Sequence, residues 1–158
     1  MSHIGPMLLS VLKETAEMRD EVLSLLADAD LGLSLGGDNP PFAVEWALLA
    51  ETQRLYIDSL RTFRMGWEGY HPNMADAQSV ASLKDIFARL DAEMDTVIEG
   101  LSAEDVANRS VDRGTWHTSV NVQLSIYREA LIIFLSRAVV HLRALRTPVP
   151  EKIQNWIG

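Results

Sequence analysis

Apolar residues recur at steps of three and four positions along most of this chain, which is the period of an amphipathic helix. The first such segment begins at Met7 and continues to Leu26. Charged residues stand mostly between its apolar positions: Lys13, Glu14, Glu17, Arg19, Asp20 and Glu21. A loop follows at residues 33–41, where paired glycines and prolines forbid a continuous helix. A second helix is predicted from Pro41, because proline suits the first helical turn, to about Arg64.

The second half of the chain predicts two further long helices. One fits Asp76 or Ser79 to Ile98, with Gly100 as its expected C-terminal cap. The other begins near Thr118 or Ser119 and ends near Leu145, before Pro148 and Pro150, which cannot extend it. Residues 130–135 are apolar around the whole circumference of this last helix. We therefore expect other parts of the bundle or a second subunit to cover this segment on more than one side.

Shorter features are predicted between and after these helices. Residues 65–74 form a loop rich in aromatic side chains, and Ser102 caps a short helical start at residues 101–105. Residues 108–118 are polar and lack periodicity. A short amphipathic turn, Ile153 to Ile157, is expected to lay Trp156 and Ile157 back on the bundle.

Four helices of this length predict an all-α fold, an antiparallel four-helix bundle in an up-down arrangement with room for one longer crossover. The 158 residues suit a single domain spanning residues 1–158, which can bury roughly 70% of its unfolded surface. No internal repeat or interdomain linker interrupts the pattern.

Composition excludes several classes of function. The chain has no cysteine, so disulfides, thiolate metal sites and cysteine nucleophiles are excluded, and a reducing cytoplasm is the expected location. Its net charge of −8 repels phosphate backbones and anionic lipids, which disfavours nucleic acid as a partner. The start lacks the basic and apolar regions of a secretory signal, and the run 130–135 is far shorter than the roughly 20 residues that cross a bilayer, so no membrane association is expected.

The order of these features resembles the DinB/YfiT-like family of four-helix proteins. The resemblance rests on the acidic first helix and on four further segments: residues 41–46, residues 50–56, Leu101-Ser102-Ala103-Glu104-Asp105, and the ending at residues 141–150. It implies a bundle with a crossover between helices two and three, frequent dimerisation, and relatives that are metal-dependent thiol-transfer or isomerase enzymes.

The same resemblance implies a divalent metal held by one histidine of helix two and two histidines of helix four. Two histidines four residues apart can share one ion because they lie on one helix face. The matching positions here are Ala130 and Phe134 on helix four and residues 48–50 on helix two, all of them apolar. The resemblance therefore carries over a fold without a metal site, and we expect neither a metal nor another cofactor.

The four histidines of the chain give little support for a different metal site, because no two of them share a short ligand spacing: His3, His71, His117 and His141. His141 is expected to fringe the core or face solvent. His117 follows Trp116 in a loop from which it could reach the mouth of the bundle, although a plain surface position is the favoured interpretation.

Charged side chains on helices two and four are the remaining candidates. Glu51, Arg54 and Asp58 follow helical steps that stack them on one face, where a surface ion-pair ladder is the simplest interpretation. Tyr127, Arg128 and Glu129 precede the apolar run. A buried acid paired with Arg54 or Arg128 would be either a structural clamp, which is favoured, or the polar floor of a ligand pocket.

Two functional hypotheses remain open. The preferred one is a non-catalytic DinB-like bundle that dimerises through apolar helix surface and holds a small ligand where the metal of its relatives sits. The alternative is a transferase or hydrolase of the DinB-like class, either metal-dependent or with a rearranged site built from Glu51, His117 and Tyr127 or Glu129. The rearranged site requires these side chains to share one cavity. The candidate ligand-binding residues are Glu51, Arg54, His117, Tyr127 and Glu129.

Overall fold

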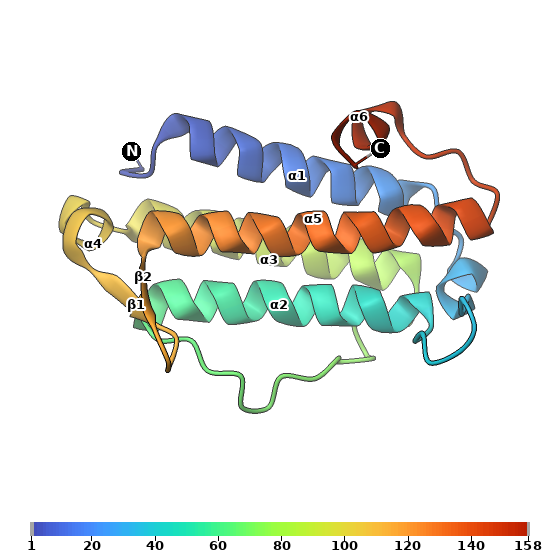
Figure 1. The fold of residues 1–158 in the computed structure, drawn as a ribbon, viewed down its shortest axis with the longest axis horizontal. Helices are drawn as coiled ribbons and strands as arrows, with labels where there is room; N and C mark the ends of the chain where they lie inside the picture. Colours follow the sequence, from blue (N-terminus) through green and yellow to red (C-terminus); the bar gives the residue numbers. More distant parts are fainter. Residues whose placement is uncertain (1, 158) are drawn as a thin grey trace.

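Four long helices carry most of the chain in a computed structural model that describes residues 2–157, with only the backbone of residue 157. They are α1 (Pro6–Ser24), α2 (Phe42–Thr62), α3 (Val80–Gly100) and α5 (Val120–Ala144). Figure 1 shows α5 between α1 and α2, with α3 behind it. The predicted all-α bundle is confirmed, and none of the described helices is long and apolar enough to cross a membrane.

The helices run in two directions rather than alternating along the chain. In Figure 1, α1 and α5 run one way and α2 and α3 run the other, because residues 63–79 cross back along α2 before α3 begins. The bundle therefore consists of two pairs of parallel helices, α1 with α5 and α2 with α3. The two pairs run in opposite directions. This crossover is the longer connection for which the sequence left room.

Serine side chains cap three of the helices. Ser79, Ser102 and Ser119 accept hydrogen bonds from backbone N–H groups at the starts of α3, α4 (Ala103–Asn108) and α5. The predicted cap at Ser102 is confirmed. The expected C-terminal cap at Gly100 is wrong: Gly100 is the last helical residue, and Leu101 ends α3 with extended backbone that needs no glycine.

The polar stretch at residues 108–118, for which no periodicity predicts an element, contains a small hairpin. Strands β1 (Ser110–Asp112) and β2 (His117–Ser119) pair antiparallel in the register Ser110 with Ser119, Val111 with Thr118 and Asp112 with His117. Three-residue strands are too short to display an alternating pattern, which is why the sequence did not reveal them. The N–H of Met65 donates to the carbonyl of Asp112 at 2.7 Å, so the hairpin is bonded to the start of the crossover.

Aromatic rings fill the bundle where α2, α3 and α5 meet. Trp46 has no exposed surface and lies against the rings of Phe134, Phe87 and Phe42, at centroid distances of 4.5, 5.8 and 5.7 Å. His141 stacks on Phe42 at 4.1 Å and is itself buried, so it belongs to the core rather than to a site at the surface.

The chain ends with a short helix, α6 (Glu151–Ile157), which differs in detail from the expected turn. Ile153, rather than Trp156, is the residue that α6 buries. Trp156 remains half-exposed, with the guanidinium of Arg128 5.0 Å from the centre of its ring. The side chain of Ile157 lies outside the described part of the chain.

The first helix buries a charge that its sequence pattern placed among solvent-facing residues. Arg19 has no exposed surface, and its Nη2 donates to Asp91 Oδ2 and to Asp20 Oδ1, both at 2.6 Å. Its Nη1 donates to Asp91 Oδ1 at 3.1 Å and to Gln53 Oε1 at 3.3 Å. The guanidinium carbon lies 4.3 Å from the centre of the Phe87 ring. One side chain of α1 thus joins α1 to both α2 and α3.

The charges around Arg19 keep it ionised although it is buried. Desolvation by burial lowers its pKa, but the hydrogen bond to Asp91 and the charges of Asp91 and Asp20 outweigh that effect, so the pKa of Arg19 is raised overall. A permanent positive charge therefore sits inside the bundle.

Replacing Arg19 by Ala should lower the free energy of unfolding by about 3 kcal/mol, because it removes the partner of a part-buried carboxylate and leaves space in the core. Urea denaturation followed by circular dichroism measures this loss. Arg89→Ala, at an exposed position of α3, is the control and should change stability by less than about 0.5 kcal/mol. Equal stability of the two variants would contradict a structural role for the buried charge.

Candidate functional site

A cleft of about 460 Å³ opens between α1 and α3 and reaches the middle of the bundle. Its walls come from α1 and α3, while Gln53 of α2 and Tyr127 and Leu131 of α5 also line it. All four long helices therefore contribute, as in bundle proteins that build a ligand site from facing side chains. The volume lies within the range of roughly 300–1,000 Å³ that is typical of small-molecule pockets.

Hydrocarbon side chains form much of the cleft surface. They come from three helices, and most of them belong to the buried core: Leu9, Leu12, Met94, Ile98 and Leu131. A ligand placed here would remove apolar surface from water, at about 25 cal/mol per Å² of surface buried.

The Tyr127 side chain is the polar group of greatest interest in the cleft. It is only 4% exposed, yet its hydroxyl makes no hydrogen bond to any residue that the structure describes. Desolvation raises the pKa of Tyr127. The nearby positive charge of Arg19 offsets only part of this increase, so the phenol stays neutral. A neutral phenol can both donate and accept a hydrogen bond.

The polar wall beside Tyr127 is already satisfied within the protein. The Gln53 amide donates to Asp91 Oδ1 at 2.8 Å while its carbonyl accepts from Arg19, so Gln53 links the two charged partners. Gln53 is 1% exposed. This network fixes the position of the wall. The Tyr127 hydroxyl takes no part in it and has no hydrogen-bond partner in the described part of the chain.

Carboxylates gather at the mouth of the cleft. Glu17, Asp20, Asp95 and Glu99 line it together with a single cation, Lys13. Desolvation raises the pKa of Asp95, and the negative charges of Asp91 and Glu99 raise it further, while Lys13 lowers it. The mouth is therefore crowded with negative charge.

The five candidates from the sequence do not form one site. Tyr127 lies in the cleft, whereas Glu129 is exposed on α5 and the His117 side chain is 64% exposed beside Asp112 in the hairpin. Glu51 and Arg54 are partly buried on α2, away from the cleft lining. The rearranged catalytic site requires Glu51, His117 and either Tyr127 or Glu129 in one cavity, and the cleft contains only Tyr127 of these.

Glu51 and Arg54 act as the structural clamp that the sequence favoured. Arg54 bonds Glu51 at 3.1 Å and Asp76 at 2.6 Å, which ties the crossover to α2. Asp58, the third member of the expected ladder, instead lies 3.5 Å from Arg61. The ladder is therefore replaced by a contact between a helix and the loop that crosses it.

The apolar positions that the DinB/YfiT-like resemblance predicts in place of metal ligands line one depression. Leu48, Leu49, Ala130 and Phe134 line a depression of about 210 Å³ between α2 and α5. Hydrocarbon offers no lone pair, so these residues do not fit the three-histidine metal site of that family. Within residues 2–157, no group of three or more His, Asp or Glu side chains is arranged to hold a metal ion.

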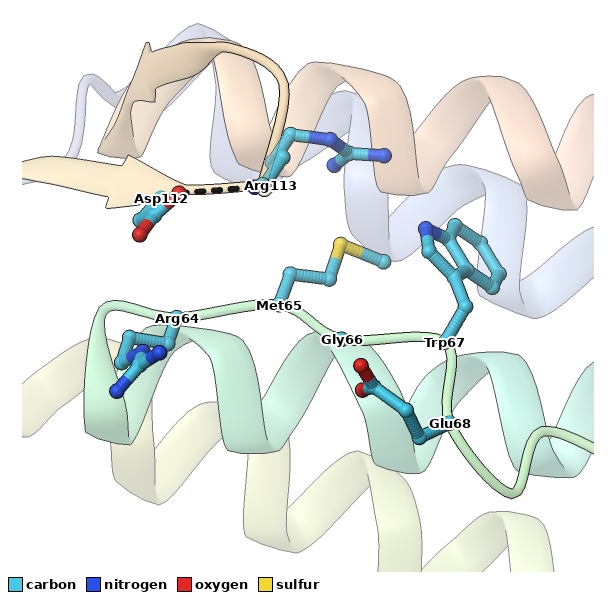
Figure 2. A pocket seen from close by; sticks show the side chains of 8 residues that line it. Arg64, Met65, Gly66, Trp67, Glu68, Asp112 and Arg113 are labelled. Atoms are coloured by element: carbon cyan, nitrogen blue, oxygen red, sulfur yellow. Dashed lines mark hydrogen bonds between the residues drawn. The ribbon is translucent and has the colours of Figure 1, made fainter.

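A second large hollow lies at the hairpin end of the bundle. Figure 2 shows the start of the crossover facing the turn of the hairpin, with the Met65, Trp67 and Arg113 side chains between them. Its volume is about 680 Å³. Arg113 bonds the buried Gln123 amide oxygen at 2.7 Å, which latches the hairpin to α5. Two exposed loops form its walls, so it is less enclosed by the bundle than the cleft.

Comparison with known proteins does not assign a family. No protein-family model matches the chain, and a search of curated proteins gives no significant match. Function is therefore inferred from the geometry of the cleft.

Three residues that shape the cleft were missed by the sequence analysis: Arg19, Gln53 and Asp91. The sequence spacing of these three residues could have indicated that they face the core. Each falls three or four residues from buried positions on its own helix, as Arg19 does from Thr15 and Val22. A polar residue in such a position faces the core and needs a partner.

Replacing Asp95 by Asn should raise the free energy of unfolding at pH 7 by less than about 1 kcal/mol, since solvent screens this exposed carboxylate. The raised pKa means that the folded chain binds a proton at Asp95 more tightly than the unfolded chain does. The ionised side chain therefore destabilises the fold, and the advantage of the variant should vanish as pH falls below the ordinary value of 3.8.

Thermal unfolding at a series of pH values checks this behaviour. Asp85→Asn serves as the control, because Asp85 is exposed on α3 outside the cleft lining. A less stable Asp95 variant at neutral pH would show that this carboxylate is needed by the fold.

Proposed function

We propose that this chain is a non-catalytic, DinB/YfiT-like bundle protein that binds a small organic molecule in the cleft between α1 and α3. The observation that carries the proposal is Tyr127, a residue only 4% exposed whose hydroxyl has no partner among the described residues and lines a cleft that reaches the bundle centre. Buried polar groups are almost always hydrogen-bonded, and a ligand would supply the missing bond.

The size of the cavities favours this cleft over the position of the family's metal. The depression lined by Leu48, Ala130 and Phe134 has less than half the volume of the cleft and falls below the usual range for ligand pockets. The Thr52 and Tyr70 hydroxyls at that depression already bond each other at 2.9 Å.

The buried groups of the cleft favour binding over catalysis, while the carboxylates of Asp95 and Glu99, unpaired within the described chain, lie at its exposed mouth. A general base must be free to take a proton, but both carboxylate oxygens of Asp91 already accept hydrogen bonds from Arg19, and one also accepts from Gln53. The neutral Tyr127 phenol is a poor base. Among the residues that the structure describes, no histidine lines the cleft.

The kinship with DinB-like proteins is supported by topology and by the convergence of three chain positions. The crossover joins α2 to α3, as the resemblance implies. Leu48, Ala130 and Phe134 are far apart in sequence, and they line one depression where that family's metal ligands would meet.

We further propose that two copies of the chain pair through α5. Ile126, Ile133 and Val140 follow one another at intervals of seven residues, about two turns, so they lie along one face of this helix. Ile133 is 56% exposed and Val140 is 49% exposed, so the single chain leaves part of this apolar face uncovered. The same face on both copies can form a closed two-fold interface.

Ligand binding is tested by replacing Ala16, which lines the cleft, with Phe. Fragments found by saturation-transfer NMR on the wild-type chain should lose their signal on Ala16→Phe, because the ring occupies the cleft. They should keep it on Ala88→Phe, an equal enlargement at an exposed position of α3. Tyr127→Phe should bind polar fragments several-fold more weakly while its thermal midpoint stays unchanged, since no protein hydrogen bond is lost.

Fragments that bind Ala16→Phe as well as they bind the wild type would place the binding site elsewhere. A large loss of stability in Tyr127→Phe would mean that the hydroxyl serves the fold instead of a ligand.

The pairing of α5 is tested by sedimentation velocity. The wild-type chain should sediment as a dimer, and Ile133→Glu should convert it to a monomer because the interface would bury an unpaired charge. Ala88→Glu introduces the same charge on α3 and should leave the dimer intact. A monomeric wild type at high concentration would refute the pairing.

A further inference from the structure

We infer that the ligand of the α1–α3 cleft is an organic cation with an apolar portion, such as an alkyl or arylalkyl amine. The inference deepens the proposed function and rests on it: the hydrocarbon part would lie on the apolar surface near Met94, Ile98 and Leu131, and the charged nitrogen would lie among the carboxylates.

The first observation behind this inference is the excess of negative charge around the cleft. Five carboxylates line it, those of Glu17, Asp20, Asp91, Asp95 and Glu99, against the single ammonium of Lys13. Two further cations lie behind or beside them: Arg19, which bonds Asp20 and Asp91, and Lys152, 3.6 Å from Glu17. Even when all three cations are counted, the carboxylates outnumber them by two.

The uncompensated charge lies on one face of α3. Asp95 and Glu99 are four residues apart, so they are neighbours on the helix surface and repel each other. Neither forms an ion pair within the described chain, whereas the other three carboxylates each do. Lys13 acts on Asp95 through its charge without approaching to ion-pair distance. A cation bound here would relieve this repulsion.

The second step comes from Tyr127, independently of the acidic residues. The residue is 4% exposed and lines the same cleft, and its hydroxyl has no hydrogen-bond partner among residues 2–157. A phenol oxygen accepts a hydrogen bond from an ammonium group or from a second polar group on the ligand. The cleft therefore combines an orphan polar group, a hydrocarbon surface and excess negative charge, and a cationic amphiphile complements all three.

An anionic ligand is the least suitable occupant. It would enter a cavity whose lining is already negative and would meet a guanidinium whose donors are engaged by Asp20, Asp91 and Gln53. A neutral ligand would gain from the hydrocarbon surface but would leave the repulsion between Asp95 and Glu99 in place.

The test compares three probes that share one carbon skeleton: 4-phenylbutylamine, 4-phenylbutan-1-ol and 4-phenylbutyrate. Isothermal titration calorimetry of the full chain at low salt should show the amine binding at least tenfold more tightly than the alcohol, with the carboxylate weakest. The affinity for the amine should fall as salt is added, because salt screens the carboxylates.

The double variant Asp95→Asn with Glu99→Gln should lose at least fivefold in affinity for the amine and keep its affinity for the alcohol. The matched control, Glu21→Gln with Asp85→Asn, removes two charges from exposed positions of α1 and α3 outside the cleft lining and should bind the amine nearly as the wild type does. Ala16→Phe should abolish binding of the amine if the site is the cleft.

The outcomes separate the two proposals. Equal affinity for amine and alcohol, lost together in Ala16→Phe, would overturn the cation preference and leave the ligand-binding cleft standing. Amine binding that survives Ala16→Phe would overturn the assignment to this cleft. Failure of all three probes to bind would overturn both.

Discussion

The buried guanidinium of Arg19 is the constraint around which the bundle is arranged. It lies on α1, and its five bonds to Asp20, Gln53 and Asp91 join that helix to α2 and α3. A buried charge is tolerated only when its partners are close and well oriented, so the three helices cannot slide past one another without breaking several bonds at once. This network therefore also fixes the positions of the cleft walls.

The aromatic cluster and the polar network divide the interior between them. Trp46 and its neighbouring rings fill the contact of α2, α3 and α5 with tightly packed hydrocarbon. The side facing α1 holds the charged groups and the cleft. Phe87 belongs to both regions, since it lies against Trp46 and also under the guanidinium of Arg19. Its ring makes a cation–π contact with the guanidinium, which lets this charged group pack against the core.

Most of the fold could be predicted from the helical periodicity of the sequence. The four long helices follow from apolar stripes, and the caps at Ser79, Ser102 and Ser119 follow from local side-chain chemistry. The hairpin did not follow, because its strands are too short to show alternation and are held by non-local bonds to residues 63–65. Tyr127 was the one candidate that belongs to the cleft. Arg19, Gln53 and Asp91 were missed because pattern analysis assigns polar and charged residues to solvent, and only tertiary contacts reveal that these three meet.

Concentrating the charges between α1 and α3 also determines what the bundle would expose to water on that side. Water entering this seam would hydrate Asp91 and Arg19 as their contacts opened, which offsets part of the energy lost. Water entering beside Trp46 would meet mostly hydrocarbon and two ring nitrogens without hydrogen-bond partners in the described chain, those of Trp46 and His141. The two sides of the interior thus differ in what they would expose to solvent: charged groups with strong hydration on the side of α1, and mainly apolar rings on the side of Trp46.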